Sequence, residues 1–176
     1  ATTDECGICN SDPADDNTTC SQDCAGLWGG NSTLDICGVC DEDPNNDLRN
    51  CQGADLAGID LSGLNLSGAD FSDAQLADSN LSNADLSGAN LSGAYLRRVN
   101  LSGANLSAAN MSGAYLHSAN LSEANLSAAN MSGAYILSTN LMAANLDDAS
   151  LSGAYMTYAD LSKASLNATN LSATSL

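Results

Sequence analysis

Large apolar side chains recur every five residues along most of this chain. Leu or a close substitute occupies 25 consecutive positions at this spacing, from Leu56 to Leu176. Ala usually lies two residues before each of these positions, Asn or Asp lies between them, and Ser often follows. The repeating unit is therefore Ala-(Asn/Asp)-Leu-Ser-Gly with variants.

A period of five residues does not fit an α-helix or a long strand. Each step of five advances about 140° beyond a full helical turn, so the Leu residues would not share one helix face. A long strand needs a period of two. Within one unit, however, Ala and Leu are two residues apart and point the same way in an extended segment, and Ser-Gly can turn the chain. Repetition of this unit predicts stacked coils that hydrogen-bond to one another and bury the Ala and Leu columns.

A second, longer period indicates the number of sides in each coil. Tyr recurs every 20 residues, at Tyr95, Tyr115, Tyr135 and Tyr155. Met replaces Leu at Met111 and again at Met131, which is 20 residues later. Four five-residue units per coil would place these residues above one another, so we expect a four-sided coil.

This pattern resembles the pentapeptide repeat family, whose motif is A-(D/N)-L-X-X. The resemblance covers residues 54–176. It implies an all-β domain, a right-handed quadrilateral β-helix of about six coils. With ~4.8 Å between neighbouring coils, the solenoid would be roughly 30 Å long.

The first 53 residues differ in composition and form a separate predicted domain, a small irregular disulfide-rich module. They contain tandem units of equal length, 4–20 and 35–51, in which Cys-Gly-x-Cys and Asp-Pro recur at matching positions. Clustered cysteines in a short, Asp-rich stretch indicate disulfides and an oxidising compartment. Since seven is an odd number, one cysteine is expected to be unpaired or to bridge to another chain. The seven are Cys6, Cys9, Cys20, Cys24, Cys37, Cys40 and Cys51.

These units resemble the D-x-C-G-x-C repeats of secreted bacterial proteins, which are similar to thrombospondin type 3 repeats. The resemblance implies disulfides and a Ca²⁺ site, because carboxylate oxygens are ligands that Ca²⁺ prefers. The candidate ligands are Asp12, Asp15, Asp16, Asp41, Asp43 and Asp47. A D-x-D-x-D-G loop is absent, and a solvated acidic surface is the alternative. The paired C-x2-C motifs leave a zinc site as a further alternative.

Charge and composition narrow the class of protein. The chain carries a formal net charge of -17, and only four Lys and Arg. So few cations cannot neutralise a phosphate track, and we therefore expect no nucleic-acid partner. No apolar stretch is long enough to span a membrane. Ala1 follows no apolar leader, which fits a mature extracellular or cell-surface chain after signal-peptide removal, or a chain without a signal.

The four-sided coil would gather unusual side chains on one face. That face would hold every Tyr, the lone His and two of the four cations of the chain. One interpretation is ring packing that stabilises the solenoid. The other is an interaction face. Its residues are Tyr95, Arg97, Arg98, Tyr115, His117, Tyr135, Leu137, Tyr155 and Tyr158.

No catalytic constellation is recognisable, and a flat solenoid side offers no cleft, so we expect no enzyme. We predict an extracellular structural protein that associates with itself, as a filament or surface layer. Contact would be end to end through the final rung, which has no cap of its own, or lateral through the Tyr-bearing face. Two alternatives are a DNA mimic that binds a topoisomerase, as some pentapeptide repeat proteins do, and an ice- or surface-binding solenoid with flat Ser and Asn columns.

Overall fold

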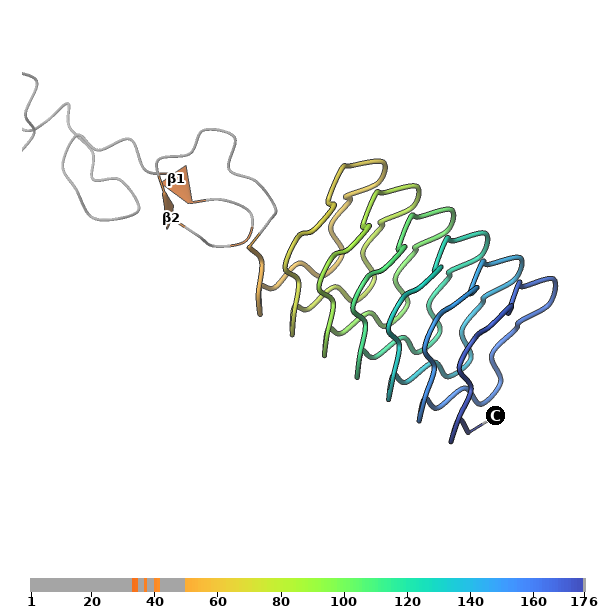
Figure 1. The fold of residues 1–176 in the computed structure, drawn as a ribbon. Helices are drawn as coiled ribbons and strands as arrows, with labels where there is room; N and C mark the ends of the chain where they lie inside the picture. The colour runs from red at the N-terminus through yellow and green to blue at the C-terminus, as the bar shows by residue number, and fades with distance from the viewer. Residues whose placement is uncertain (1–32, 35–36, 38–39, 42–49, 176) are drawn as a thin grey trace, which may run out of the picture. The chain divides into compact units, whose positions relative to one another are not determined.

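The computed structural model describes residues 33–34, 37, 40–41 and 50–175 (Figure 1). The chain divides into two compact units, Ala1–Leu48 and Arg49–Leu176. In the first unit, β1 (Thr33–Leu34) and β2 (Cys40–Asp41) pair antiparallel, with Leu34 opposite Cys40. The second unit is the solenoid. The described part of the chain includes no helix with the length and apolar character needed to cross a membrane.

The solenoid is a stack of coils in which residues 20 apart lie on neighbouring turns (Figure 1). Parallel bridges join every fifth residue to the residue 20 positions later, from Asn50↔Asp70 to Tyr155↔Ser175. Four five-residue units therefore complete one coil, as the 20-residue period predicts. Each extended piece contributes a single bridge residue, so no continuous strand forms within residues 50–175.

Each five-residue unit closes with a β-turn at its corner. In one unit the Ala114 N–H donates to the Met111 carbonyl at 3.1 Å, and the intervening Gly113 has φ 66°. A left-handed residue recurs at this place in every unit from Gly53 to Ala173. The turn returns the chain to an extended conformation within two residues, which is why a period of five can be sustained.

The core consists of two kinds of inward side chain. The large apolar residue of each unit and the residue two positions earlier are both buried through the middle coils; Leu121 and Ala119 are examples, at 0% and 1% exposure. Leu columns and Ala columns therefore alternate around the inside of the coil. Among the described residues, every buried side-chain nitrogen or oxygen has a hydrogen-bond partner.

The regular solenoid begins earlier than the composition suggested. Asn50 already bridges Asp70, and Cys51, fully buried, occupies the position that Leu holds in later units. The Cys51 N–H donates to the Asp70 carbonyl at 2.8 Å. The expected boundary after Gly53 thus lies inside the solenoid, because Cys51 serves the core as a small apolar residue and was counted only as a cysteine of the preceding module.

Candidate interaction face

Four tyrosines form one column on the outside of the solenoid. Each occupies the bridge position of its unit, and Tyr95, Tyr115, Tyr135 and Tyr155 are joined coil to coil by parallel bridges. Their ring centroids are 4.9, 4.9 and 5.0 Å apart, with interplanar angles of 8°, 2° and 8°. The first and last rings are 43% and 47% exposed. We call this column, with the residues two and three positions after each Tyr, the Tyr face.

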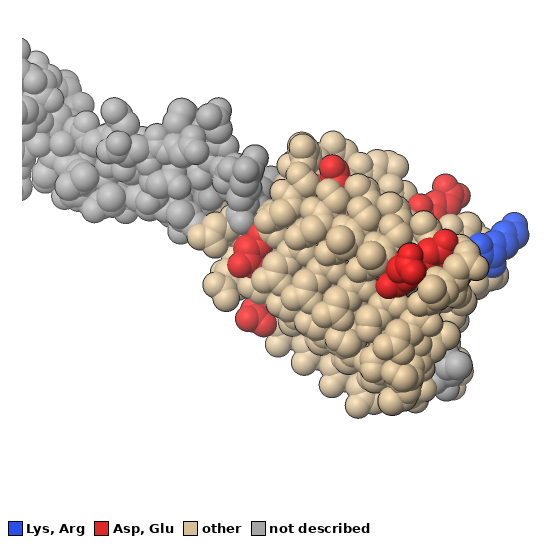
Figure 2. Space-filling view, in the orientation of Figure 1, with Lys and Arg blue, Asp and Glu red and all other residues tan. Residues whose placement is uncertain are grey.

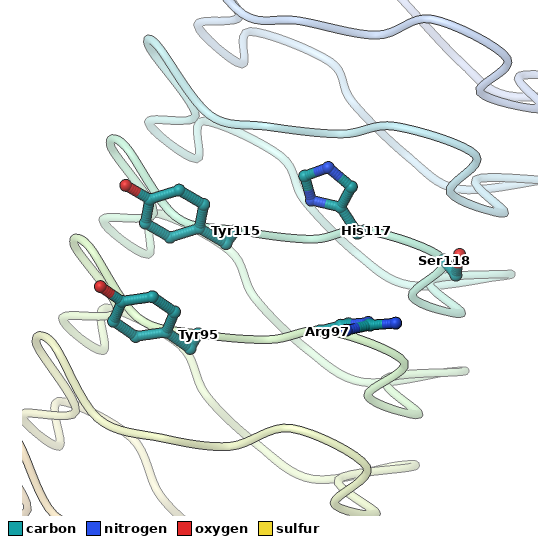
Figure 3. A pocket seen from close by; sticks show the side chains of 5 residues that line it. All are labelled: Tyr95, Arg97, Tyr115, His117 and Ser118. Carbon is teal, nitrogen blue, oxygen red and sulfur yellow. The ribbon is translucent and has the colours of Figure 1, made fainter.

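A shallow hollow lies between the tyrosines and the next column. Its lining residues are Tyr95, Arg97, Tyr115, His117 and Ser118. Figure 3 shows the two phenol rings on adjacent coils, with Arg97 and His117 further along the same two coils. The side expected to be flat therefore has a shallow concavity at this place.

Arg98 does not belong with the free groups of this face. It occupies a left-handed turn position, with φ 55°, and its guanidinium makes a bidentate ion pair with Asp78 on the preceding coil. Hydrogen bonding from Arg98 is the main reason that the pKa of Asp78 is lowered. Arg98 is one of the predicted interaction residues, but in the structure its charge is already neutralised by Asp78 within the solenoid. Arg97 makes no ion pair with any other described residue.

Two other predicted members differ in their setting. Tyr158 lies at a left-handed turn position, φ 63°, and is 86% exposed, outside the stacked column. Leu137 follows Arg97 and His117 in the column beside the tyrosines and is only partly exposed. The 20-residue period identified the column correctly, but it carried no information on which members remain without an intrachain partner.

The other three sides carry ladders of hydrogen-bonded Asn side chains. On one side the Asn110 amide Nδ2 donates to Asn90 Oδ1 at 3.1 Å, and Asn90 Nδ2 donates to Asp70 Oδ1 at 3.1 Å. Equivalent ladders rise from Asp60 and Asp85. The same Oδ1 atoms accept the backbone N–H two residues on, as Asn110 does from Ser112 at 3.3 Å. The ladders were not foreseen, although Asn at a spacing of 20 on three sides was a signal for them.

The Tyr face has no corresponding ladder of side-chain hydrogen bonds among the described residues. A Tyr at the bridge position offers no oxygen to the backbone two residues later. Accordingly, the N–H groups of Arg97 and His117 donate no hydrogen bond to any described residue. The Arg97 guanidinium and the four stacked phenol hydroxyls likewise make no hydrogen bond within residues 50–175. This face presents hydrogen-bond donors to its surroundings, whereas the Asn sides largely use theirs internally.

The cysteine-rich unit contributes little to a described site. Cys37 and Cys51 are each disulfide-bonded. No group of three or more metal-ligating side chains occurs among the described residues. Of the calcium candidates, Asp41 lies in β2 and the others lie outside the described residues, as do the remaining predicted cysteines apart from Cys40 in β2.

Comparison with known proteins assigns the family. The model for pentapeptide repeats matches in eight copies over residues 50–88, 74–113, 109–146 and 138–172. The chain therefore belongs to the pentapeptide repeat family, and this supports the right-handed quadrilateral β-helix expected from the motif. No curated protein sequence matches the chain.

Solved structures resemble the solenoid. A trypsin-treated variant of QnrB1, a plasmid-mediated fluoroquinolone resistance protein, is 22% identical over 69% of this chain and 74% of its own, with a TM-score of 0.56. A pentapeptide repeat protein of the Arabidopsis thaliana thylakoid lumen is 36% identical over 56% and 68%, with a TM-score of 0.35. HetL from Nostoc sp. strain PCC 7120, involved in heterocyst differentiation regulation, is 25% identical over 75% and 89%, with a TM-score of 0.36.

Proposed function

We propose that this protein is a non-enzymatic, extracellular structural protein whose copies associate through the Tyr face. The observation that carries the proposal is the contrast between the sides of the solenoid. Three sides use their Asn Oδ1 atoms to accept backbone and side-chain N–H groups. The fourth keeps the backbone N–H group two residues after each stacked Tyr, a guanidinium and a row of phenols without partners among the described residues. Exposed aromatic and Arg groups are typical of protein interfaces.

The chemistry of this face favours an acidic partner. Arg97 and His117 lie on adjacent coils and line one hollow. A guanidinium and backbone N–H groups are both donors that suit a carboxylate, so we infer a carboxylate ligand. Residues 1–53 of a second copy fit this description, since they hold 11 acidic residues against Arg49, a net charge of -10. Charge complementarity of this kind steers association and sets its register.

Contact between unlike surfaces determines the type of assembly. If the Tyr face met its own copy about a two-fold axis, association would end at a dimer. If the Tyr face of one copy instead binds the acidic segment of another, the first copy still has a free acidic segment and the second still has a free Tyr face. Further copies can then be added, and growth continues as a filament or layer. End-to-end stacking of coils would be a different contact, which does not use the Tyr face and which Arg97→Glu would leave intact.

The proposed location rests on the cysteines. Disulfides persist in oxidising compartments, and both Cys37 and Cys51 are disulfide-bonded. A Ca²⁺ site in the acidic segment remains part of the proposal, because its Asp residues supply suitable ligands. Neither the disulfides nor the proposed Ca²⁺ site requires that the protein be an enzyme.

The two alternatives are less well supported by the geometry. A DNA mimic needs dense negative charge, and in Figure 2 the acidic side chains on the visible side of the solenoid are few and scattered. Binding to ice or another regular surface needs free hydroxyls. Several Ser hydroxyls instead donate to the Asn or Asp of their own unit, as Ser132 does to Asn130 at 2.7 Å.

The test compares two variants with the same change in charge. Arg97→Glu alters the Tyr face, and Lys163→Glu alters an exposed position in a later coil on another side. We expect electron microscopy to show filaments or layers for the wild type and for Lys163→Glu, and single solenoids for Arg97→Glu. Single solenoids in concentrated wild-type protein, or equal assembly by both variants, would contradict the proposal. Inhibition of gyrase supercoiling would instead favour the DNA mimic.

A further inference from the structure

We propose that the Tyr column is a site of oxidative modification, at which neighbouring phenols are coupled into dityrosine links between successive coils. This inference goes beyond the proposed function and does not rest on it, because the reaction takes place within one chain. Its oxidant is hydrogen peroxide turned over by a haem peroxidase.

The geometry brings the reacting rings together before any oxidation. Tyr115 and Tyr135 are bridged through their backbones, and their rings are 4.9 Å apart and parallel within 2°. The two rings are therefore held as parallel neighbours on adjacent coils. Reactants held in this way behave as if at very high concentration, so coupling within the column should exceed random encounter.

The phenol ends are free to react. No hydroxyl of the column makes a hydrogen bond to a described residue, and the rings at the two ends of the column are nearly half exposed. Unclamped side chains can tilt until two ring carbons reach bonding distance. Competing sulfur is scarce on this face, because Met156 is 2% exposed and Met142, which is 37% exposed, lies on another side.

The step balances in atoms and electrons. Each of two tyrosines loses one electron and its phenol proton to the peroxidase, which leaves two phenoxyl radicals. The radicals join through their ortho carbons, the two ortho protons leave, and both oxygens are reprotonated from water. One hydrogen peroxide is reduced to two waters, and the protein loses two hydrogen atoms for each carbon–carbon bond formed.

The experiment uses two triple variants that keep two tyrosines each. Tyr95→Phe with Tyr155→Phe and Tyr158→Phe retains the adjacent pair 115 and 135. Tyr115→Phe with Tyr135→Phe and Tyr158→Phe retains Tyr95 and Tyr155, three coils apart. Phe preserves the aromatic stack in both, and circular dichroism with thermal unfolding checks that both fold as the wild type does.

Dilute, monomeric protein is treated with peroxidase and hydrogen peroxide, and dityrosine is measured by fluorescence and by mass spectrometry of cross-linked peptides. We expect the adjacent pair to give at least about tenfold more intrachain dityrosine than the distant pair, reflecting proximity. Equal yields, links only between chains, or wild-type coupling confined to Tyr158 would overturn the inference. Failure of wild-type assembly at high concentration would leave this result unaffected, so the two proposals fail separately.

Discussion

Asn at the bridge position serves two purposes with one side chain. Its Oδ1 accepts the N–H of the following turn, and its Nδ2 donates to the coil before it; Asn110 does both. The donation always runs toward the N-terminal coil, so the first rung of a ladder needs only an acceptor. The three ladders begin at Asp60, Asp70 and Asp85, which can accept but cannot donate when ionised.

A carboxylate in the middle of a ladder should therefore be unfavourable. Asn110→Asp removes the donor to Asn90 and places two acceptor oxygens against each other. We expect it to lower the free energy of unfolding by about 1 kcal/mol at neutral pH, the usual net value of one hydrogen bond. Asp70→Asn is the control, because it keeps an acceptor at the first rung. Chemical denaturation of both variants measures the difference, and equal stability would show that ladder direction has no energetic weight.

The ladder carboxylates also predict how stability depends on pH. The Ser72 hydroxyl and backbone N–H, with smaller help from Asn90, lower the pKa of Asp70 below its ordinary 3.8, and Asp60 is lowered mainly by Ser62. A lowered folded-state pKa means that this stabilisation is complete above the unfolded-state pKa and is lost as the pH falls through the folded-state value. We expect the urea midpoint to be level near neutrality and to fall below about pH 4, and to fall less steeply in Asp70→Asn. A midpoint that rose on acidification would contradict this assignment.

The five-residue unit depends on one residue with left-handed backbone geometry. Gly occupies this place in many units, but Ala108, Ala128 and Lys163 adopt it as well, with φ of 56°, 57° and 62°. A non-Gly residue in this region has an energetic cost, which the neighbouring coils outweigh through the bonds they form on either side of the turn. The turn conformation is therefore stabilised by the neighbouring coils and not by the five-residue unit alone.

A β-branched residue at a left-handed turn position should lower the free energy of unfolding. Gly113 has φ 66°, and a Cβ there would meet no atom within 4 Å, so a substitution tests conformation without a clash. We expect Gly113→Val to reduce the free energy of unfolding by about 1–2 kcal/mol. Gly113→Asn should cost clearly less, since Asn tolerates left-handed geometry and Asn83 already adopts φ 58° in another turn. Similar losses in the two variants would indicate that something other than backbone conformation is responsible.

Acidic side chains are most concentrated in residues 1–53, whereas the hydrogen-bond donors without a partner among the described residues lie on the Tyr face. Residues 1–53 carry a net charge of -10, while residues 54–176 hold ten acids and three cations. One of those cations, Arg98, is neutralised by Asp78, and Lys163 lies on another side. Arg97 is therefore the cation that the Tyr face offers to a partner. Under the proposed self-association, this asymmetry would favour contact between unlike surfaces of two copies.

The coil and the placement of its tyrosines could be predicted because they follow from periodicity alone. A period of five fixes which residues point inward, and a period of 20 fixes which residues lie above one another; Tyr95 and Tyr115 therefore had to share a side. The disulfide role of Cys51 was predicted correctly, but its place in the solenoid core was not, because a cysteine can serve either purpose and in this molecule it is both buried and disulfide-bonded.

Periodic patterns specify columns, because the direction of each side chain along a regular backbone is set by its position in the repeat. They do not specify partners across coils, because those depend on atom positions that only the stacked coils bring within hydrogen-bonding distance. The chain's order of residues thus establishes a four-sided solenoid with one aromatic side. The stacked structure establishes that Arg98 is paired with Asp78 and that Asn side chains bond to one another along their sides, since both follow from contact between residues 20 apart. It also shows that the donors beside Tyr95 and Tyr115 have no hydrogen-bond partner among the described residues.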